Sequence, residues 1–221
     1  MLTLGIDTSA TMISVALADN RRLLGEFFAH SRQKHSASLL PMIDALLLHC
    51  GHNIAEIERF CVTQGPGSFT GLRIGVATAK GLATARDKPC AGVSTLHAMA
   101  ANAASLEGTL CCAMDARRMQ VYAALFRDGS RLCEDEALPI AELEQRLDGP
   151  VWFLGDGAQL CYDSMQKCVD RNLAPEQLRY QRAYGAILAA GEADYRPAEE
   201  LRATYLRPSQ AERLRNEGLR S

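Results

Sequence analysis

The stretch of sequence that most constrains the fold is Gln64-Gly65-Pro66-Gly67-Ser68-Phe69-Thr70-Gly71-Leu72-Arg73-Ile74-Gly75. An apolar run over 59–63 precedes it and is typical of a β-strand, and a run over 76–85 follows it and predicts a helix. A Gly-rich turn between a strand and a helix presents backbone N–H groups at the positive end of the helix, where they can hold an anion or a partner's carboxylate.

The spacing of these glycines matches neither of the common nucleotide-binding fingerprints. Gly65, Gly67 and Gly71 give G-x-G-x-x-x-G, which is one residue longer than the dinucleotide pattern, and no G-K-[ST] follows as in a P-loop. Two interpretations therefore stay open: the turn serves chain packing alone, or it contacts a partner or a ligand.

The first half of the chain predicts three strands followed by alternating helices and strands. Hydrophobic period and turn residues place the strands at 2–6, 12–18 and 23–29, with a turn at Asp19-Asn20. A helix over 36–49 follows, capped by Ser36 or Ser38 and ended by Gly51, and a helical turn follows at 53–56. The remaining predicted elements of this half are a strand at 59–63, a helix at 69–85, a strand at 89–93 and a helix from the cap Ser94 to about 104.

The second half repeats this order more weakly, with strands predicted at 109–114, 119–126, 132–138 and 151–154, and helices at 140–147, 158–169 and 182–190. Two tandem βββαβαβα units with mixed sheets describe the actin-like ATPase (ribonuclease H-like) fold, an α/β class. The expected subdomains are 1–106 and 107–221, and the polar, Arg-rich end from Tyr205 is expected to fray.

An actin-like fold rests a nucleotide phosphate on the turn after the first strand of each half. In the first half this turn is Gly5-Ile6-Asp7-Thr8-Ser9. Asp7 could hold a metal-bound water and the Thr8 and Ser9 hydroxyls could donate to phosphate, or these side chains could simply satisfy a tight turn. The matching stretch of the second half, 113–119, has Asp115 but no glycine and two arginines, so it predicts no backbone cradle. We therefore expect a vestigial phosphate turn at Asp7, Thr8 and Ser9.

Composition and motifs argue against other chemistry. The 221 residues carry a formal net charge of −2, which is unusual for a protein that binds nucleic acid strongly on its own. The eight cysteines form no C-x-x-C pair, and the sequence has neither H-x-x-x-H nor G-x-S-x-G. We expect no catalytic residue and no metal ligand. The chain also shows no signal peptide and no apolar run near 20 residues, so we expect a cytoplasmic protein without a membrane span.

Two helices have faces that could meet another protein. The helix at 36–49 is apolar on more than one side, and the helix at 69–85 carries small residues at four-residue spacing. Burial within the chain is the alternative explanation. The predicted partner surface consists of Leu39, Met42, Ile43, Leu46, Gly71, Leu72, Gly75 and Val76.

Three segments together resemble the tRNA threonylcarbamoyladenosine biosynthesis proteins of the TsaB (YeaZ) family. They are Gly5 to Ser9, Gly65 to Gly75, and Tyr205-Leu206-Arg207-Pro208. The resemblance implies an actin-like, non-catalytic paralogue of TsaD, the subunit that transfers threonylcarbamoyl to N6 of the adenosine beside the anticodon in tRNAs that read codons beginning with adenine. TsaD uses a metal held by histidines, and no matching pair stands in this sequence.

The same resemblance implies partners for the chain. It implies a platform for a TsaD-like subunit, joined by the ATPase TsaE, and a homodimer through the first two helices when the chain is alone. Contact with tRNA is expected only through the complex, and ATP or ADP only at the partner interface. The alternatives are a small kinase or ATPase of the actin-like superfamily, which needs Asp7 and Asp115 at one cleft, and a peptidase, for which no nucleophile or metal is apparent.

Overall fold

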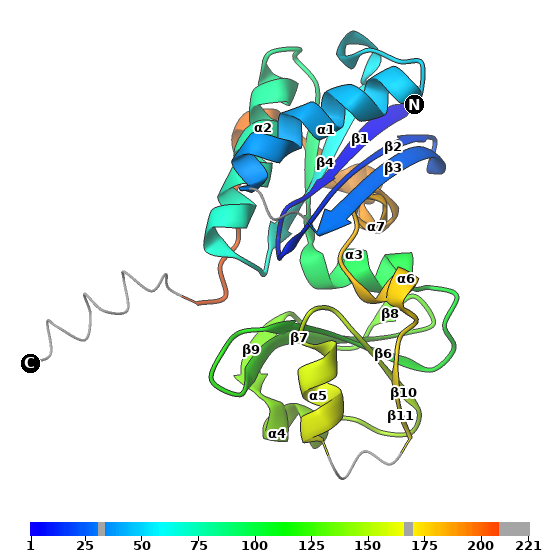
Figure 1. The fold of residues 1–221 in the computed structure, drawn as a ribbon, viewed down its shortest axis with the longest axis vertical. Coiled ribbons are helices and arrows are strands. Elements are labelled where there is room, and N and C mark those ends of the chain that lie inside the picture. The colour runs from blue at the N-terminus through cyan, green and yellow to red at the C-terminus, as the bar shows by residue number, and fades with distance from the viewer. Residues whose placement is uncertain (31–33, 166–169, 208–221) are drawn as a thin grey trace, which may run out of the picture.

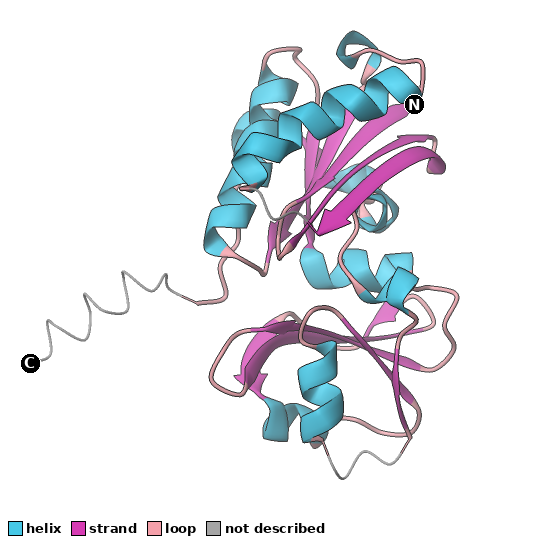
Figure 2. Ribbon diagram, in the orientation of Figure 1, coloured by secondary structure: helices cyan, strands magenta, loops and turns pink. Residues whose placement is uncertain are grey.

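A computed structural model describes residues 1–30, 34–165 and 170–207 as two mixed sheets flanked by helices (Figures 1 and 2). The first sheet has the order β12-β5-β4-β1-β2-β3. Strands β1, β4 and β5 run parallel, β2 and β12 pair antiparallel with β1 and β5, and β3 pairs antiparallel with β2. The bounds are β1 Leu2–Asp7, β2 Met12–Asp19, β3 Arg22–His30, β4 Arg59–Gly65, β5 Cys90–Ser94 and β12 Tyr195–Arg196.

Helices cover both faces of the first sheet (Figure 1). Helices α1 (His35–His49) and α2 (Phe69–Thr84) pack on one face, and α3 (Thr95–Asn102) and α7 (Ala183–Ala189) pack on the other. The central strand β1 is buried along its whole length and β4 at every residue but Gln64, as expected for parallel strands between two helical layers. Short 3-10 turns complete this half at η1 (Ile54–Glu56), η2 (Glu192–Asp194) and η3 (Ala198–Glu200).

The second sheet has the order β11-β10-β6-β7-β8, and β9 pairs with β7. Helices α4 (Ile140–Glu144) and α5 (Ala158–Ser164) cover one face, while α3 and α6 (Glu176–Arg179) contact the other. Helix α3 therefore lies between the two sheets, and Leu96 and Met99 join the core formed by β6 and β7. The bounds are β6 Thr109–Asp115, β7 Gln120–Arg127, β8 Ser130–Arg131, β9 Glu136–Pro139, β10 Val151–Leu154 and β11 Arg171–Leu173.

The predicted order of elements in the first half is confirmed, with one wrong cap. Ser94 caps α3 by accepting from the His97 amide at 3.1 Å, as predicted. Helix α1, however, begins at His35, and its N-cap Lys34 makes no side-chain capping bond, so neither Ser36 nor Ser38 is the cap. The His35 ring instead bonds to the Ala10 carbonyl at 2.8 Å, which places the start of the helix beside the turn after β1.

The second half departs further from the sequence prediction. The strand expected at 132–138 is present only from residue 136, as β9, and the short strand β8 lies before the predicted range, at Ser130–Arg131. Helices α4 and α5 end at residues 144 and 164, earlier than predicted, and residues 166–169 lie outside the described part of the chain. Short elements with weak periodicity are the ones whose bounds tertiary packing decides.

The last part of the chain returns to the first half. Helix α7 buries Ala183, Ala186 and Ile187 against β1, β2 and β4, and β12 pairs with β5. The prediction placed residues 107–221 together in the second subdomain. From residue 183 onward the chain instead packs on the first sheet, because the apolar face of α7 covers that sheet. The predicted break near residue 106 stays a prediction. No helix among the described residues is long and apolar enough to span a membrane.

Candidate functional site

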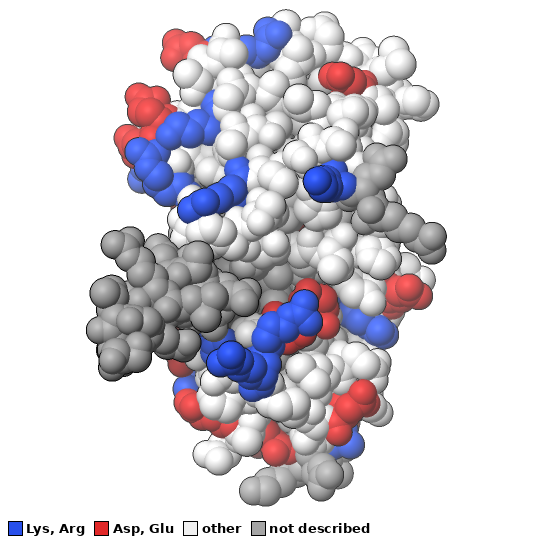
Figure 3. Space-filling view, turned by 60° about the vertical axis from the view of Figure 1, so that its left-hand side comes forward, with Lys and Arg blue, Asp and Glu red and all other residues white. Residues whose placement is uncertain are grey.

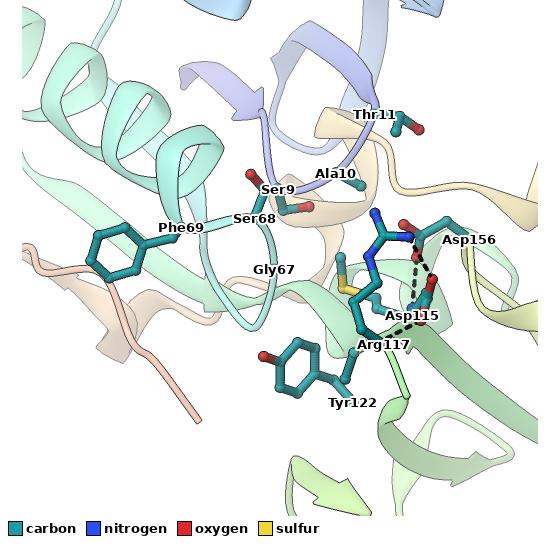
Figure 4. Close-up of a pocket in the computed structure, with 12 residues that line it drawn as sticks. Ser9, Ala10, Thr11, Gly67, Ser68, Phe69, Asp115, Arg117, Tyr122 and Asp156 are labelled. Carbon is teal, nitrogen blue, oxygen red and sulfur yellow. Dashed lines mark hydrogen bonds and ion pairs between the residues drawn. The ribbon is translucent and has the colours of Figure 1, made fainter. Parts of the chain in front are cut away.

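A cleft of about 470 Å³ separates the two halves (Figure 4). Its walls come from the turn after β1, the start of α2, and the turns after β6 and β10. Most of the lining is polar, with two aromatic rings at the rim. The lining residues are Ser9, Ala10, Thr11, Gly67, Ser68, Phe69, Met114, Asp115, Ala116, Arg117, Tyr122 and Asp156.

The turn after β1 uses its polar groups internally. Asp7 is buried, and its Oδ1 accepts from the Ser9 amide at 2.9 Å and the Ser9 hydroxyl at 2.7 Å. The Thr8 hydroxyl donates to the Gly71 carbonyl at 2.7 Å. Of the three predicted phosphate-turn residues, only Ser9 lines the cleft. Burial raises the pKa of Asp7 to about 6, and the two bonds from Ser9 oppose that rise.

Glycines of the stretch from Gln64 to Gly75 pack against the turn after β1. A Cβ on Gly71 would lie 2.0 Å from the Thr8 carbonyl oxygen, and one on Gly75 would lie 2.4 Å from the Thr8 hydroxyl. The Ser68 amide also donates to the Ser9 carbonyl at 2.6 Å. The row of small residues therefore brings α2 against the chain's own first turn, so the predicted packing of a partner helix on Gly71 and Gly75 is wrong.

The turns after β6 and β10 carry the charged side of the cleft. The Asp115 amide donates to Asp156 Oδ1 at 3.3 Å, and the Arg117 amide donates to Asp115 Oδ1 at 2.7 Å. The Arg117 guanidinium also pairs with Asp115 at 3.3 Å (Figure 4). Burial raises the pKa of Asp156 to about 6; the Asp115 amide opposes this and the Asp115 carboxylate adds to it. In the space-filling view, basic and acidic side chains meet beside this hollow (Figure 3).

This arrangement leaves little for a bound phosphate. The amides of Ser9, Ser68, Asp115 and Arg117 already bond to oxygens of the chain, and two carboxylates face one arginine. A phosphate cradle instead offers free amides and net positive charge. Across the described residues, no three His, Cys, Asp or Glu side chains come together in a group that could hold a metal ion.

The predicted partner surface is largely buried inside this chain. Seven of its eight residues are buried, and the eighth, Met42, is half-buried against the core. The prediction of these residues as a surface is therefore wrong, because both helices use that face to cover the first sheet. The exposed faces of the same helices carry other side chains, namely Leu40 and Leu48 on α1 and Arg73, Ala77 and Gly81 on α2.

Sequence reasoning missed three residues that border the cleft. Phe69 and Tyr122 form aromatic parts of its rim, and Arg207 bonds to the hairpin between β6 and β7. The antiparallel pairing of Met114 with Tyr122 could have placed Tyr122 beside Asp115, because the predicted strands already faced each other. Arg207 carried no such signal, since its contacts join residues far apart in the sequence.

The comparisons with known proteins decide the family. The family model described as "TsaD: tRNA N6-adenosine threonylcarbamoyltransferase" matches residues 23–210. The "tRNA threonylcarbamoyladenosine biosynthesis protein TsaB" of Bacillus subtilis is 35% identical over 167 residues, which cover 72% of this chain and 73% of the relative. The chain belongs to the TsaB (YeaZ) family. The TsaB protein of Escherichia coli is likewise 35% identical, over 72% of this chain and 73% of its own length.

Solved structures agree with this TsaB assignment. YeaZ from Pseudomonas aeruginosa superposes with a TM-score of 0.77 at 26% identity, covering 93% of this chain and 99% of the other. Component A of the (R)-2-hydroxyglutaryl-CoA dehydratase of Acidaminococcus fermentans shares the fold alone, with a TM-score of 0.52 at 11% identity, over 86% of this chain and 97% of the other. The predicted actin-like fold is confirmed.

Proposed function

We propose that this chain is a non-catalytic platform subunit for N6-threonylcarbamoylation of the adenosine beside the anticodon of tRNA. It acts with a TsaD-like transferase and a TsaE-like ATPase, and tRNA reaches it through that complex. Its relatives in Bacillus subtilis and Escherichia coli are named as proteins of this biosynthesis. The cytoplasm is the corresponding predicted location.

A non-catalytic role is supported by the cleft, several of whose polar groups are already bonded to other groups of the chain. The amides of Ser9, Asp115 and Arg117 are bonded within the chain, and the Arg117 guanidinium lies against Asp115. A kinase of this fold needs those amides and a second Gly-rich turn. A peptidase needs an activated nucleophile, but the Ser68 hydroxyl accepts from the Gly71 amide as the cap of α2, and no histidine lines the cleft.

A titration with Mg·ATP separates the platform from the kinase. We expect no heat of binding from the isolated chain at millimolar nucleotide, because the cleft offers occupied amides and two carboxylates. Saturable binding of Mg·ATP to the isolated chain that is lost in Asp115→Asn would instead support the kinase hypothesis. Nucleotide binding that appears only in the complex fits a site at the partner interface.

The partner surface we propose is the exposed side of α1 and α2. Leu48 is 76% exposed and Leu40 is 50% exposed, eight residues apart on one helix. On α2, Ala77 and Gly81 leave the backbone open to close approach, and nothing lies within 4 Å of a Cβ on Gly81. Exposed large apolar side chains on α1 and exposed small residues on α2 suit a helix of another subunit. The same face would serve the TsaD-like subunit or a second copy of this chain.

A binding assay with the TsaD-like relative tests this surface. We expect Leu48→Asp to weaken binding at least tenfold without loss of folding, since the side chain is exposed. Leu132→Asp is the matched control, because Leu132 is also exposed, at 51%, but lies in the second half. Equal binding by wild type and Leu48→Asp would place the interface elsewhere. Leu46 cannot serve this test, since it is buried and an aspartate there would unfold the core.

A further inference from the structure

The last described residues, Thr204 to Arg207, begin on the first half of the molecule. The Thr204 amide donates to the Gln64 carbonyl at 2.7 Å, as a strand-like extension of the end of β4. Gly65 lies beneath it, and a Cβ there would be 2.1 Å from the Thr204 carbonyl oxygen. The segment is therefore seated on the Gly-rich turn through backbone contacts that only glycine allows.

Tyr205 attaches the segment to α2. Its ring lies 4.5 Å from the ring of Phe69, and its hydroxyl accepts from Arg73 Nε at 3.2 Å. The Arg73 guanidinium in turn stacks on Phe69 at 3.9 Å. These three side chains form one stacked group at the start of α2, on the rim of the cleft.

Arg207 then crosses to the second half. One Nη donates to the Ala116 carbonyl at 3.1 Å, and the other donates to the Gln120 side-chain oxygen. The guanidinium also lies 5.7 Å above the centre of the Tyr122 ring. Ala116 and Tyr122 both line the cleft, so Arg207 joins the wall opposite to the one that Tyr205 contacts. A planar guanidinium holds its donors in a fixed fork that matches two such acceptors, whereas an ammonium is a point charge without that fixed geometry.

The two halves are thus joined on two sides. The buried core around α3 joins them on one side, and Thr204 to Arg207 join them at the cleft by three separate contacts. We propose that residues 204–207 form a clasp that sets the opening of the cleft and connects the exposed face of α2 to the hairpin between β6 and β7. Naming a TsaD-like subunit as the partner that engages the clasp rests on the proposed function; the clasp itself does not.

The clasp lies within reach of a partner on α2. Arg73, which bonds to Tyr205, is exposed on the same helix side as Ala77, and Tyr205 is itself 37% exposed. A subunit that packs on this side contacts the stacked group directly. Its binding then orders the segment and, through Arg207, the hairpin on the far wall.

Amide hydrogen exchange on the full chain tests the clasp without any partner. We expect exchange in the peptide 113–122 to become about tenfold faster in Arg207→Ala, because charge-assisted bonds to the hairpin are lost. Arg207→Lys should also exchange faster, since it keeps the charge but not the fork. Arg202→Ala is the control, because Arg202 donates to carbonyls of its own segment, Glu199 and Leu201. Wild-type exchange in Arg207→Ala, with an unchanged melting temperature, would overturn the clasp.

A second arm adds the TsaD-like subunit. The proposal predicts that binding protects 113–122 in wild type and fails to protect it in Arg207→Ala, although both bind. Equal protection in both would overturn the connection through the clasp. Absence of binding by either would overturn the proposed function and the connection to that partner, while the first arm still decides the clasp.

Discussion

The turns after β1 and β6 occupy the same place in the two halves, yet the aspartate of the first is buried within the molecule and that of the second faces the cleft. Each follows the first strand of its half and each presents an aspartate. Asp7 is buried beneath its own turn and bonds to Ser9. Asp115 lies at the cleft, where it pairs with the exposed Arg117.

The turn after β1 is a packing contact inside the molecule, which we call the joint, whereas the turn after β6 is part of the surface. In the first half, Gly71 and Gly75 let α2 approach the backbone of Thr8 closely, and this contact fixes the helix whose outer face we assign to a partner. In the second half, the hairpin turn projects from the sheet, with Arg117 and Arg118 exposed and in left-handed conformation. In both turns, amides that face the cleft already bond to oxygens of the chain, namely those of Ser9, Asp115 and Arg117.

The largest expected effect breaks the joint in the first half. Gly71→Ala should lower the free energy of unfolding by about 3 kcal/mol, because its Cβ would meet the Thr8 carbonyl at 2.0 Å and backbone must move. Gly81→Ala on the same helix is the control, since nothing lies within 4 Å; it should stabilise by roughly 0.5–1 kcal/mol. Urea unfolding measures both, and equal stability of the two variants would contradict the joint.

The second prediction concerns the buried carboxyl of that joint. Because the pKa of Asp7 rises from 3.8 to about 6 on folding, the folded state holds the proton more tightly between these values. The free energy of unfolding should therefore fall as pH rises from 4 to 7, by about 2–3 kcal/mol from this group.

Asp7→Asn should remove that fall and leave the smaller one from Asp156, whose pKa is also raised but whose side chain is nearer to solvent. Denaturant unfolding at several pH values measures the slope. A slope that is unchanged in Asp7→Asn would show that the carboxyl is ionised or solvated in the folded chain.

The smallest effect is expected at the second turn. A Cβ on Gly157 would lie 3.0 Å from the Asp115 amide nitrogen and the Met114 carbonyl carbon and 3.1 Å from the Ala113 carbonyl oxygen, so it is less close than the Cβ on Gly71 and needs a smaller backbone shift. Gly157→Ala should therefore cost only about 1 kcal/mol in the free energy of unfolding. The same urea measurement checks it, and a loss as large as that of Gly71→Ala would erase the contrast between the turns.

The fold of the first half could be predicted from sequence because its signals are local. Alternating strands, the Asp-Asn turn and the cap Ser94 each act within a few residues. What could not be predicted was which face of α1 and α2 is inward. Helix α1 is apolar on more than one side, so its pattern did not show that Leu39 and Leu46, predicted as a surface, are buried.

Only some residues of the cleft could be predicted, because the others are placed by contacts between distant parts of the sequence. Asp115 and Ser9 follow strands, so their places were readable from the order of elements. The contacts of Arg207 with Ala116 and Gln120 join residues about 90 positions apart, and the return of α7 to the first sheet depends on tertiary packing. No local pattern reports such contacts.

The most direct test of the account is a reconstituted transfer assay. The TsaD-like transferase and TsaE-like ATPase are incubated with tRNA and threonylcarbamoyl-AMP, with or without this chain, and modified adenosine is measured by mass spectrometry. We predict modification only when the chain joins both proteins, full activity with Asp115→Asn, and none from the chain alone. Modification by the chain alone, abolished by Asp115→Asn, would contradict the account.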